Sequence, residues 1–209
     1  MRPRLLLVPM FLVFAALAWA GCDAIASKLG IDKVAVPLGS AGQNLAVNTA
    51  TAAAQTASLS RPGGDLPDVF DVASILLESS QITFTPTAAT KTAQSGTVRV
   101  AVVVSGYPAI LGDITIVNDI VTQVSPAPMP VGAVDMTKFN AMVAATPQAQ
   151  RPVLASDYAT ASGPAIRTKV GTALRSTSFS VTVLVQGVAG GGTIAGTLTI
   201  NQGTFNLDF

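Results

Sequence analysis

The chain contains 209 residues, 49% of them hydrophobic and 11% charged, with 12 Lys and Arg against 11 Asp and Glu, a single Cys and no His. The absence of His excludes a Ser-His-Asp triad, a Cys-His pair and a His-ligated metal, and a single Cys excludes an internal disulfide and a thiolate zinc cluster. A formal net charge of +1 without a basic block argues against nucleic-acid binding.

The first 22 residues predict an export signal. Arg2 and Arg4 precede an apolar run at residues 5–18, which is shorter than the about 20 residues that a membrane-spanning helix needs. Small residues follow this run, and Cys22, the only cysteine, comes directly after them. The pattern predicts a signal peptide over residues 1–21.

The stretch Trp19-Ala20-Gly21-Cys22 resembles the lipobox of bacterial lipoproteins. The resemblance implies that Cys22 is the lipid attachment site and that residues 22–30 tether the domain to a membrane of the bacterial cell envelope, on its periplasmic or surface side. One position departs from the family pattern, because Trp19 stands where the lipobox usually has an aliphatic residue. Ala18-Trp19-Ala20 offers an alternative site for ordinary signal peptidase, with cleavage before Gly21.

Residues 31–209 predict a single, mainly antiparallel all-β domain. Apolar and polar residues alternate in nine candidate strands, at residues 34–38, 45–51, 81–85, 97–104, 110–117, 120–125, 178–185, 193–200 and 204–209. Alternation of this kind is typical of strands with one buried face. Eight or nine strands favour a β-sandwich-like fold, with one to three short helices in the connections.

Some of these strands carry more specific information. Residues 97–104 predict a strand that is central or covered on both sides, because Ala101 and Val103 make its second face apolar. Asn118-Asp119 predicts a tight turn between two strands. Glycine-containing turns at 190–192 and 201–203 predict that 178–209 forms a three-stranded meander.

Three segments predict helices. Residues 68–79 have Pro67 ahead of them and Asp68 as a candidate N-cap, and residues 164–175 begin with a proline and carry apolar residues four apart. Residues 136–144 predict a third, short helix. The Pro-rich stretch 125–135 and the two later helices define an excursion from the sheet at about 125–176, where we expect function to lie.

Two further segments are rich in small polar residues. Residues 43–60 predict an edge strand or a loosely packed segment, and residues 86–96 predict a surface loop.

The candidate chemistry is sparse. Asp65, Asp68 and Asp71 recur every three residues beside two glycines and could bind Ca²⁺, although their spacing does not match an EF-hand. The alternative is that these carboxylates lie at the N-terminus of a helix, where its dipole favours them. Asp71 and Glu78 could form a carboxylate pair, but a solvated helix face explains them better. No nucleophile motif is present, so we expect neither catalysis nor a cofactor.

The sequence therefore predicts a lipid-anchored, exported β-sandwich that acts as a non-catalytic binding, adhesion or envelope-structural module. Its expected partners are the membrane, through the N-terminal lipid, and either an envelope protein or a second copy of the chain. The alternatives are a self-assembling surface or fimbrial subunit, a carrier of lipid or another hydrophobic ligand, and a small outer-membrane β-barrel. The barrel alternative arises because Phe205, Leu207 and Phe209 resemble the C-terminal signal of such barrels.

Overall fold

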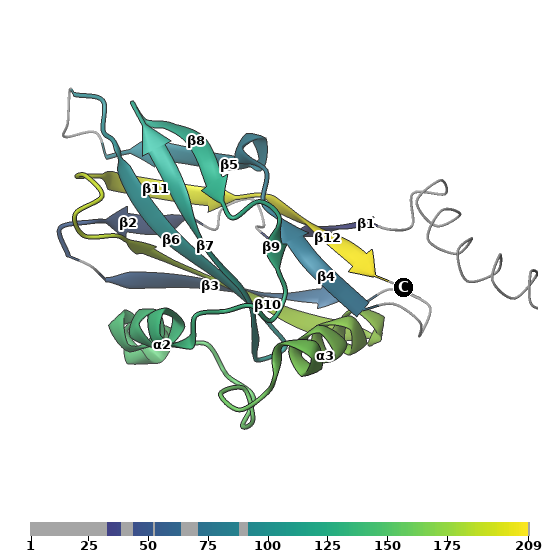
Figure 1. The fold of residues 1–209 in the computed structure, drawn as a ribbon. Helices are drawn as coiled ribbons and strands as arrows, with labels where there is room; N and C mark the ends of the chain where they lie inside the picture. The colour runs from purple at the N-terminus through teal and green to yellow at the C-terminus, as the bar shows by residue number, and fades with distance from the viewer. Residues whose placement is uncertain (1–32, 39–43, 52, 64–70, 88–91, 209) are drawn as a thin grey trace, which may run out of the picture.

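The computed structural model describes residues 33–208, except for 39–43, 52, 64–70 and 88–91. Within the described residues, the chain forms twelve strands, two α-helices and two short 3-10 turns (Figure 1). The strands are β1 (Lys33–Pro37), β2 (Leu45–Asn48), β3 (Ala54–Pro62), β4 (Asp71–Leu76), β5 (Ile82–Pro86), β6 (Gly96–Val104), β7 (Tyr107–Val117), β8 (Ile120–Ser125), β9 (Met129–Pro130), β10 (Ser178–Gly187), β11 (Ala195–Ile200) and β12 (Gln202–Asp208). The helices are α2 (Met136–Ala145) and α3 (Gly163–Arg175), and the turns are η1 (Ser79–Gln81) and η2 (Gln148–Gln150).

One layer of the fold is a five-stranded antiparallel sheet in the order β3-β10-β6-β7-β8. Alternate residues of its three central strands point inward and are buried, and they include Val98, Val100, Val102, Ile110, Ile114, Val181, Val183 and Val185. This arrangement follows from the alternation in the sequence, since successive side chains of a strand point to opposite faces.

The opposite layer consists of two sheets that continue into each other. Their strand orders are β1-β12-β4-β9 and β2-β11-β5, and Asn201 alone joins β11 to β12. The backbone N–H of Asn201 donates to the carbonyl of Gln81 at 2.9 Å, and the N–H of Leu38 donates to the carbonyl of Asn201 at 3.0 Å. Because hydrogen bonds cross the break on both sides of Asn201, the two sheets form one bent layer over a common core.

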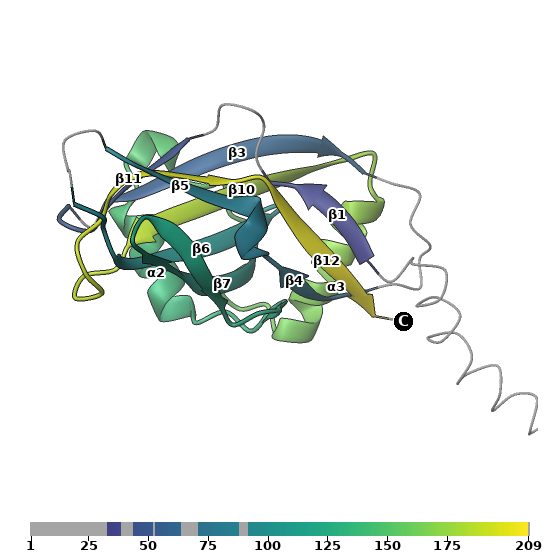
Figure 2. The same cartoon turned by 90° about the horizontal axis from the view of Figure 1, so that it is seen from above.

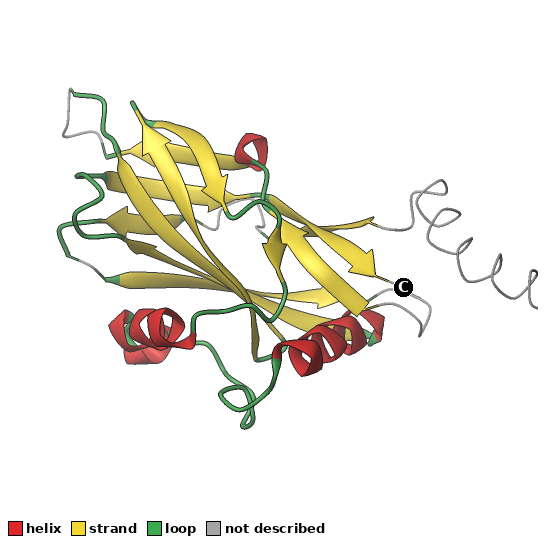
Figure 3. Cartoon of the chain, in the orientation of Figure 1, coloured by secondary structure: helices red, strands yellow, loops and turns green. Residues whose placement is uncertain are grey.

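The two helices lie on the same side of the sandwich in Figures 1 and 3, but they pack against different parts of it. Helix α2 packs on the outer face of the five-stranded sheet, where Phe139 and Met142 meet Ala101, Val103 and Leu184 in a second hydrophobic cluster. Helix α3 turns buried residues such as Ile166, Val170 and Leu174 into the main core, beside β4 and β7.

Several sequence predictions are confirmed. The fold is mostly antiparallel β and sandwich-like, helices occur at 136–145 and 163–175, and β6 is covered on both faces. The turn between β7 and β8 has positive φ at Asn118 (51°) and Asp119 (64°), as a two-residue hairpin turn requires. The segment 43–60 does contain edge strands, namely β2 and most of β3. The sequence predicts eight or nine strands, whereas the described residues form twelve, because β3, β4 and β9 are separate strands that the alternation does not predict.

The predicted helix at 68–79 is wrong. Its residues 71–76 form strand β4, which pairs with β12, and residues 64–70 lie outside the described part of the chain. Val72 pairs with Leu207 and Ile75 with Phe205, so Ala73 is an extra residue on the β4 side. This β-bulge places two buried side chains three residues apart, a spacing that is also typical of a helix.

The predicted three-stranded meander at 178–209 is also wrong, although all three strands exist. β10, β11 and β12 belong to three different sheets and do not pair with one another. The glycine run at 190–192 connects the two layers of the sandwich, rather than two neighbours in one sheet. Residues 201–203 do not form a chain-reversing turn either, because β12 continues in the direction of β11 beyond Asn201.

Candidate binding surface

The loop between η2 and α3 is fixed to the turn between β6 and β7. The N–H of Ala155 donates to the carbonyl of Gly106 at 3.0 Å. Gly106 has a φ of +87°, and a Cβ at this position would lie 2.7 Å from the nitrogen of Ala155. Glycine is therefore required here twice, for the left-handed backbone and for the close approach of the loop.

Tyr107, which follows this turn, is held between two charged side chains. Its hydroxyl donates to Oδ1 of Asp157 at 2.8 Å, and Nζ of Lys169 on α3 lies 5.7 Å from the centre of its ring. The hydrogen bond to Asp157 is the main cause that raises the pKa of Tyr107 above its ordinary value of 10.0. The phenol therefore remains protonated at neutral pH and acts as a hydrogen-bond donor.

Tyr158, the other tyrosine of the chain, is held by the same loop. Its hydroxyl donates to Oδ1 of Asn140 on α2 at 3.3 Å, and its ring meets that of Phe139 edge-on with 6.3 Å between centroids. Val153, in the same loop, is 89% exposed. We call Tyr107, Val153, Asp157, Tyr158 and Lys169 the tyrosine loop surface.

The tyrosine loop surface combines several kinds of side chain. It offers two aromatic rings, a carboxylate, an ammonium group and an exposed aliphatic side chain within one region. A protonated phenol bonded to a carboxylate is a poor nucleophile, since its reactive form is the phenolate. Tyrosine combines a rigid apolar ring with a polar tip, and this combination is common at binding surfaces.

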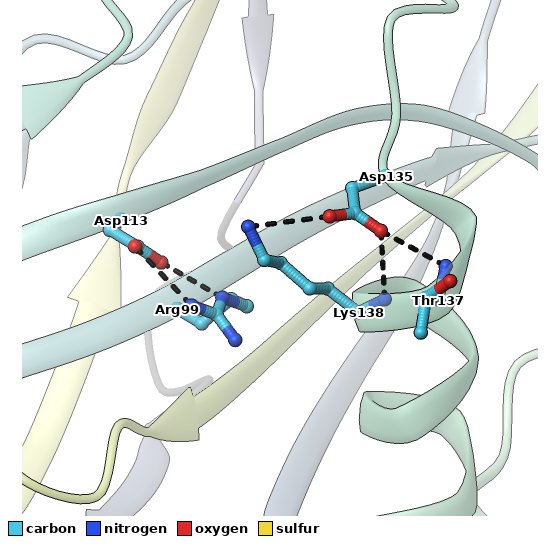
Figure 4. Close-up of polar contacts among 5 residues, drawn as sticks. All are labelled: Arg99, Asp113, Asp135, Thr137 and Lys138. Carbon is cyan, nitrogen blue, oxygen red and sulfur yellow. Dashed lines mark hydrogen bonds and ion pairs between the residues drawn. The ribbon is translucent and has the colours of Figure 1, made fainter.

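A second polar region lies on the outer face of the five-stranded sheet (Figure 4). Nε of Arg99 on β6 donates to Oδ1 of Asp113 on β7 at 3.0 Å, and the side chains are 21% and 41% exposed. Asp135 caps α2 by accepting from the N–H groups of Thr137 and Lys138, and the bond from the N–H of Lys138 is the main cause that lowers the pKa of its carboxyl. Arg99 and Asp113 stabilise neighbouring strands, and Asp135 stabilises the start of a helix, so neither contact by itself indicates a ligand.

The predicted calcium ligands lie mostly outside the described part of the chain. Asp65 and Asp68 lie outside the described residues, as does Cys22. Asp71 begins β4, where its Oδ2 accepts from Oγ1 of Thr168 on α3 at 3.4 Å. Glu78 is exposed and accepts from the hydroxyl of Ser80 at 3.4 Å. Among the residues that the structure describes, no three Cys, Asp or Glu side chains come together as a metal site.

Comparisons with protein-family models, with curated proteins and with solved structures gave no match. Within the described ranges, none of the helices combines the length and the apolar character required to cross a membrane. The fold itself places the chain in the class of mainly antiparallel, sandwich-like β-proteins, with one helix on the outer face of a sheet and another in the core.

Proposed function

We propose that the protein is an exported lipoprotein, anchored through Cys22, whose β-sandwich acts as a non-catalytic binding module in the bacterial cell envelope. The tyrosine loop surface is the proposed recognition site. Its partner would be another component of the envelope with polar groups that match the phenol, carboxylate and ammonium of this surface.

The fixed display of both tyrosines is the observation that carries the binding role. Each ring is held at its hydroxyl by a side chain from another segment, Asp157 or Asn140. Helices α2 and α3 bury their apolar residues in the two hydrophobic clusters, so both ends of the segment that carries the loop are fixed to the sandwich. A surface that is ordered before binding loses less conformational entropy when a partner arrives.

The anchoring role is supported by the position of the only cysteine at the end of the apolar run. Two or three acyl chains at Cys22 would hold the domain firmly, because each buried CH₂ contributes about 0.8 kcal/mol. Eleven residues lead from Cys22 to Lys33 at the start of β1, and even fully extended they span at most about 40 Å. The sandwich would therefore work close to the membrane surface.

The anchor is tested by the intact mass of the protein isolated from membranes, beside a Cys22→Ala variant. We expect a mature chain that begins at Cys22 and carries the mass of two or three acyl chains, and we expect the variant to lack this form. An unmodified mature chain that begins at Gly21 would refute lipid anchoring.

The recognition site is tested by photo-crosslinking in cells. A photoreactive phenylalanine analogue replaces Val153 in one variant and Thr83, an exposed residue of β5 in the opposite layer, in the control. We expect a discrete crosslinked product at position 153 alone, and its loss when Asp157→Ala and Lys169→Ala are added. Equal products at both positions, or a product at 153 that survives these substitutions, would contradict the assignment.

A further inference from the structure

Strand β3 forms a long, regular edge of the five-stranded sheet. It pairs with β10 over nine consecutive residues, from Ala54 opposite Gln186 to Pro62 opposite Ser178, without a register shift. No other described strand pairs with it, and Figure 2 shows β3 along an outer margin of the sandwich. β3 is therefore an edge strand among the described residues, and an edge strand of this kind can pair with another strand.

β3 lacks most of the devices that protect edge strands from pairing. Such edges usually carry lysine, a bulge, a central proline or an inward-pointing charge, or are covered by a helix or loop. A turn does contact one part of β3, where Oγ1 of Thr56 donates to the carbonyl of Gln150 in η2. β3 has no lysine, its only proline is its last residue, and Arg61 is its only charged residue. The opposite edge of the same sheet is different, because β8 is shorter and its register with β7 is interrupted after Thr115.

We propose that β3 is an interface between two copies of this chain, which pair antiparallel about a two-fold axis through Ser58. In this register all nine residues of β3 face residues of the partner. A shift of two residues would also keep each face of the sheet continuous, but it would leave two residues at each end unpaired. The result is a continuous ten-stranded sheet.

In this register, the side chains of β3 in one copy fit those of β3 in the partner. Ala57 lies opposite the partner's Leu59 on the inner face, where Ala57 already packs against the main core. Arg61 lies opposite the partner's Gln55, so the only charges of the two strands are not placed against each other. The outer face pairs Thr56 with the partner's Ser60, and small polar residues of this kind are tolerated across strands. This match to itself favours a second copy as the occupant.

The register is tested by disulfide trapping in the full chain. At the two-fold axis, the Cα atoms of Ser58 and the partner's Ser58 would be about 4.5–5.5 Å apart, within the about 4.4–6.8 Å range of disulfides. Ser60, which is exposed on the same face, would lie more than about 13 Å from the partner's Ser60, four strand residues away. Envelope preparations of the Ser58→Cys, Ser60→Cys and unsubstituted chains are oxidised with copper phenanthroline and run on non-reducing gels.

We expect a dimer band for Ser58→Cys at least severalfold stronger than for Ser60→Cys, whose band should match the Cys22 background of the unsubstituted chain. Equal bands for the two variants, or a band no stronger than background for Ser58→Cys, would overturn the proposed register. Lipidation of Cys22 does not enter this comparison, so it is independent of the proposed anchor.

A second pair of variants covers the possibility that cysteine at position 58 disturbs the fold, since the Ser58 hydroxyl hydrogen-bonds that of Thr182 at 2.8 Å. Ser58→Lys would place two like charges opposite each other at the axis, whereas Ser60→Lys would face threonine. By sedimentation velocity of the purified full chain, we expect dimers for the unsubstituted and Ser60→Lys proteins and monomers for Ser58→Lys. A monomeric unsubstituted protein at all concentrations would refute the interface.

Discussion

Replacement of Phe139 by alanine tests whether α2 is an integral part of the fold. Phe139 is fully buried between α2 and the outer face of the five-stranded sheet, against Ala101, Val103 and Leu184. An aromatic side chain buries about 150 Å² or more, which at about 25 cal/mol per Å² corresponds to about 4 kcal/mol. Measured Phe→Ala substitutions in cores cost about 3–5 kcal/mol, in agreement with this value. We therefore expect Phe139→Ala to lower the free energy of unfolding by about 4 kcal/mol.

Equilibrium urea unfolding measures this loss. With a slope of about 2 kcal/mol per M, the unfolding midpoint of Phe139→Ala should fall by about 2 M. The matched control is Lys138→Ala, the neighbouring residue, whose side chain is 54% exposed and forms only a surface ion pair. If the two variants unfold at the same urea concentration, α2 does not stabilise the sheet, and the tyrosine loop surface loses its support.

The remaining predictions concern single contacts. Gly106→Ala should lower the thermal unfolding midpoint by several degrees in calorimetry, because alanine is strained at a φ of +87° and its Cβ would lie too close to Ala155. An unchanged midpoint would show that the loop around Ala155 does not pack against Gly106. In absorbance titration at 295 nm, Tyr107 should ionise above pH 10, and Asp157→Asn should move this ionisation to lower pH, whereas an unmoved titration would contradict the hydrogen bond. The pKa of Asp135 is lower in the folded state, so its carboxylate contributes stability at neutral pH that is lost as pH falls below about 3.8. The difference in unfolding midpoint between wild type and Asp135→Asn should therefore shrink in acid. A difference that does not depend on pH would show that the charge of Asp135 is not its cause.

The sheet pattern could be predicted from the sequence wherever strand geometry is regular. In β6 and β10, alternate valines face the core, and the structure buries them as the alternation predicts. In β4 the bulge at Ala73 changes the spacing of buried residues from two to three, and this spacing of apolar residues in the sequence is also typical of a helix. A bulge is decided by the partner strand, here β12, which lies about 130 residues away in the chain. Local periodicity carries no information about such a partner.

Strand pairing was harder to predict than strand position. The segment around Asn201 contains turn-forming residues, and the buried positions change from even numbers in β11 to odd numbers in β12. Both observations are typical of a hairpin, but a bend within one continuous layer produces them as well. The distinction depends on the hydrogen bonds of Asn201 to Gln81 and Leu38, two segments that are distant in sequence.

The sequence places most of the tyrosine loop surface within the excursion at about 125–176, where we expect function to lie, but it does not predict that Tyr107 joins this surface. Tyr107 and Asp157 are fifty residues apart, and each alone reads as an ordinary exposed polar residue. They meet because Gly106 accepts a hydrogen bond from Ala155, a contact between two connections rather than between two periodic elements. Hydrophobic periodicity reports which residues must leave water, and it therefore locates the core. Exposed residues are free of that constraint, so the sequence does not show which of them lie side by side in the fold.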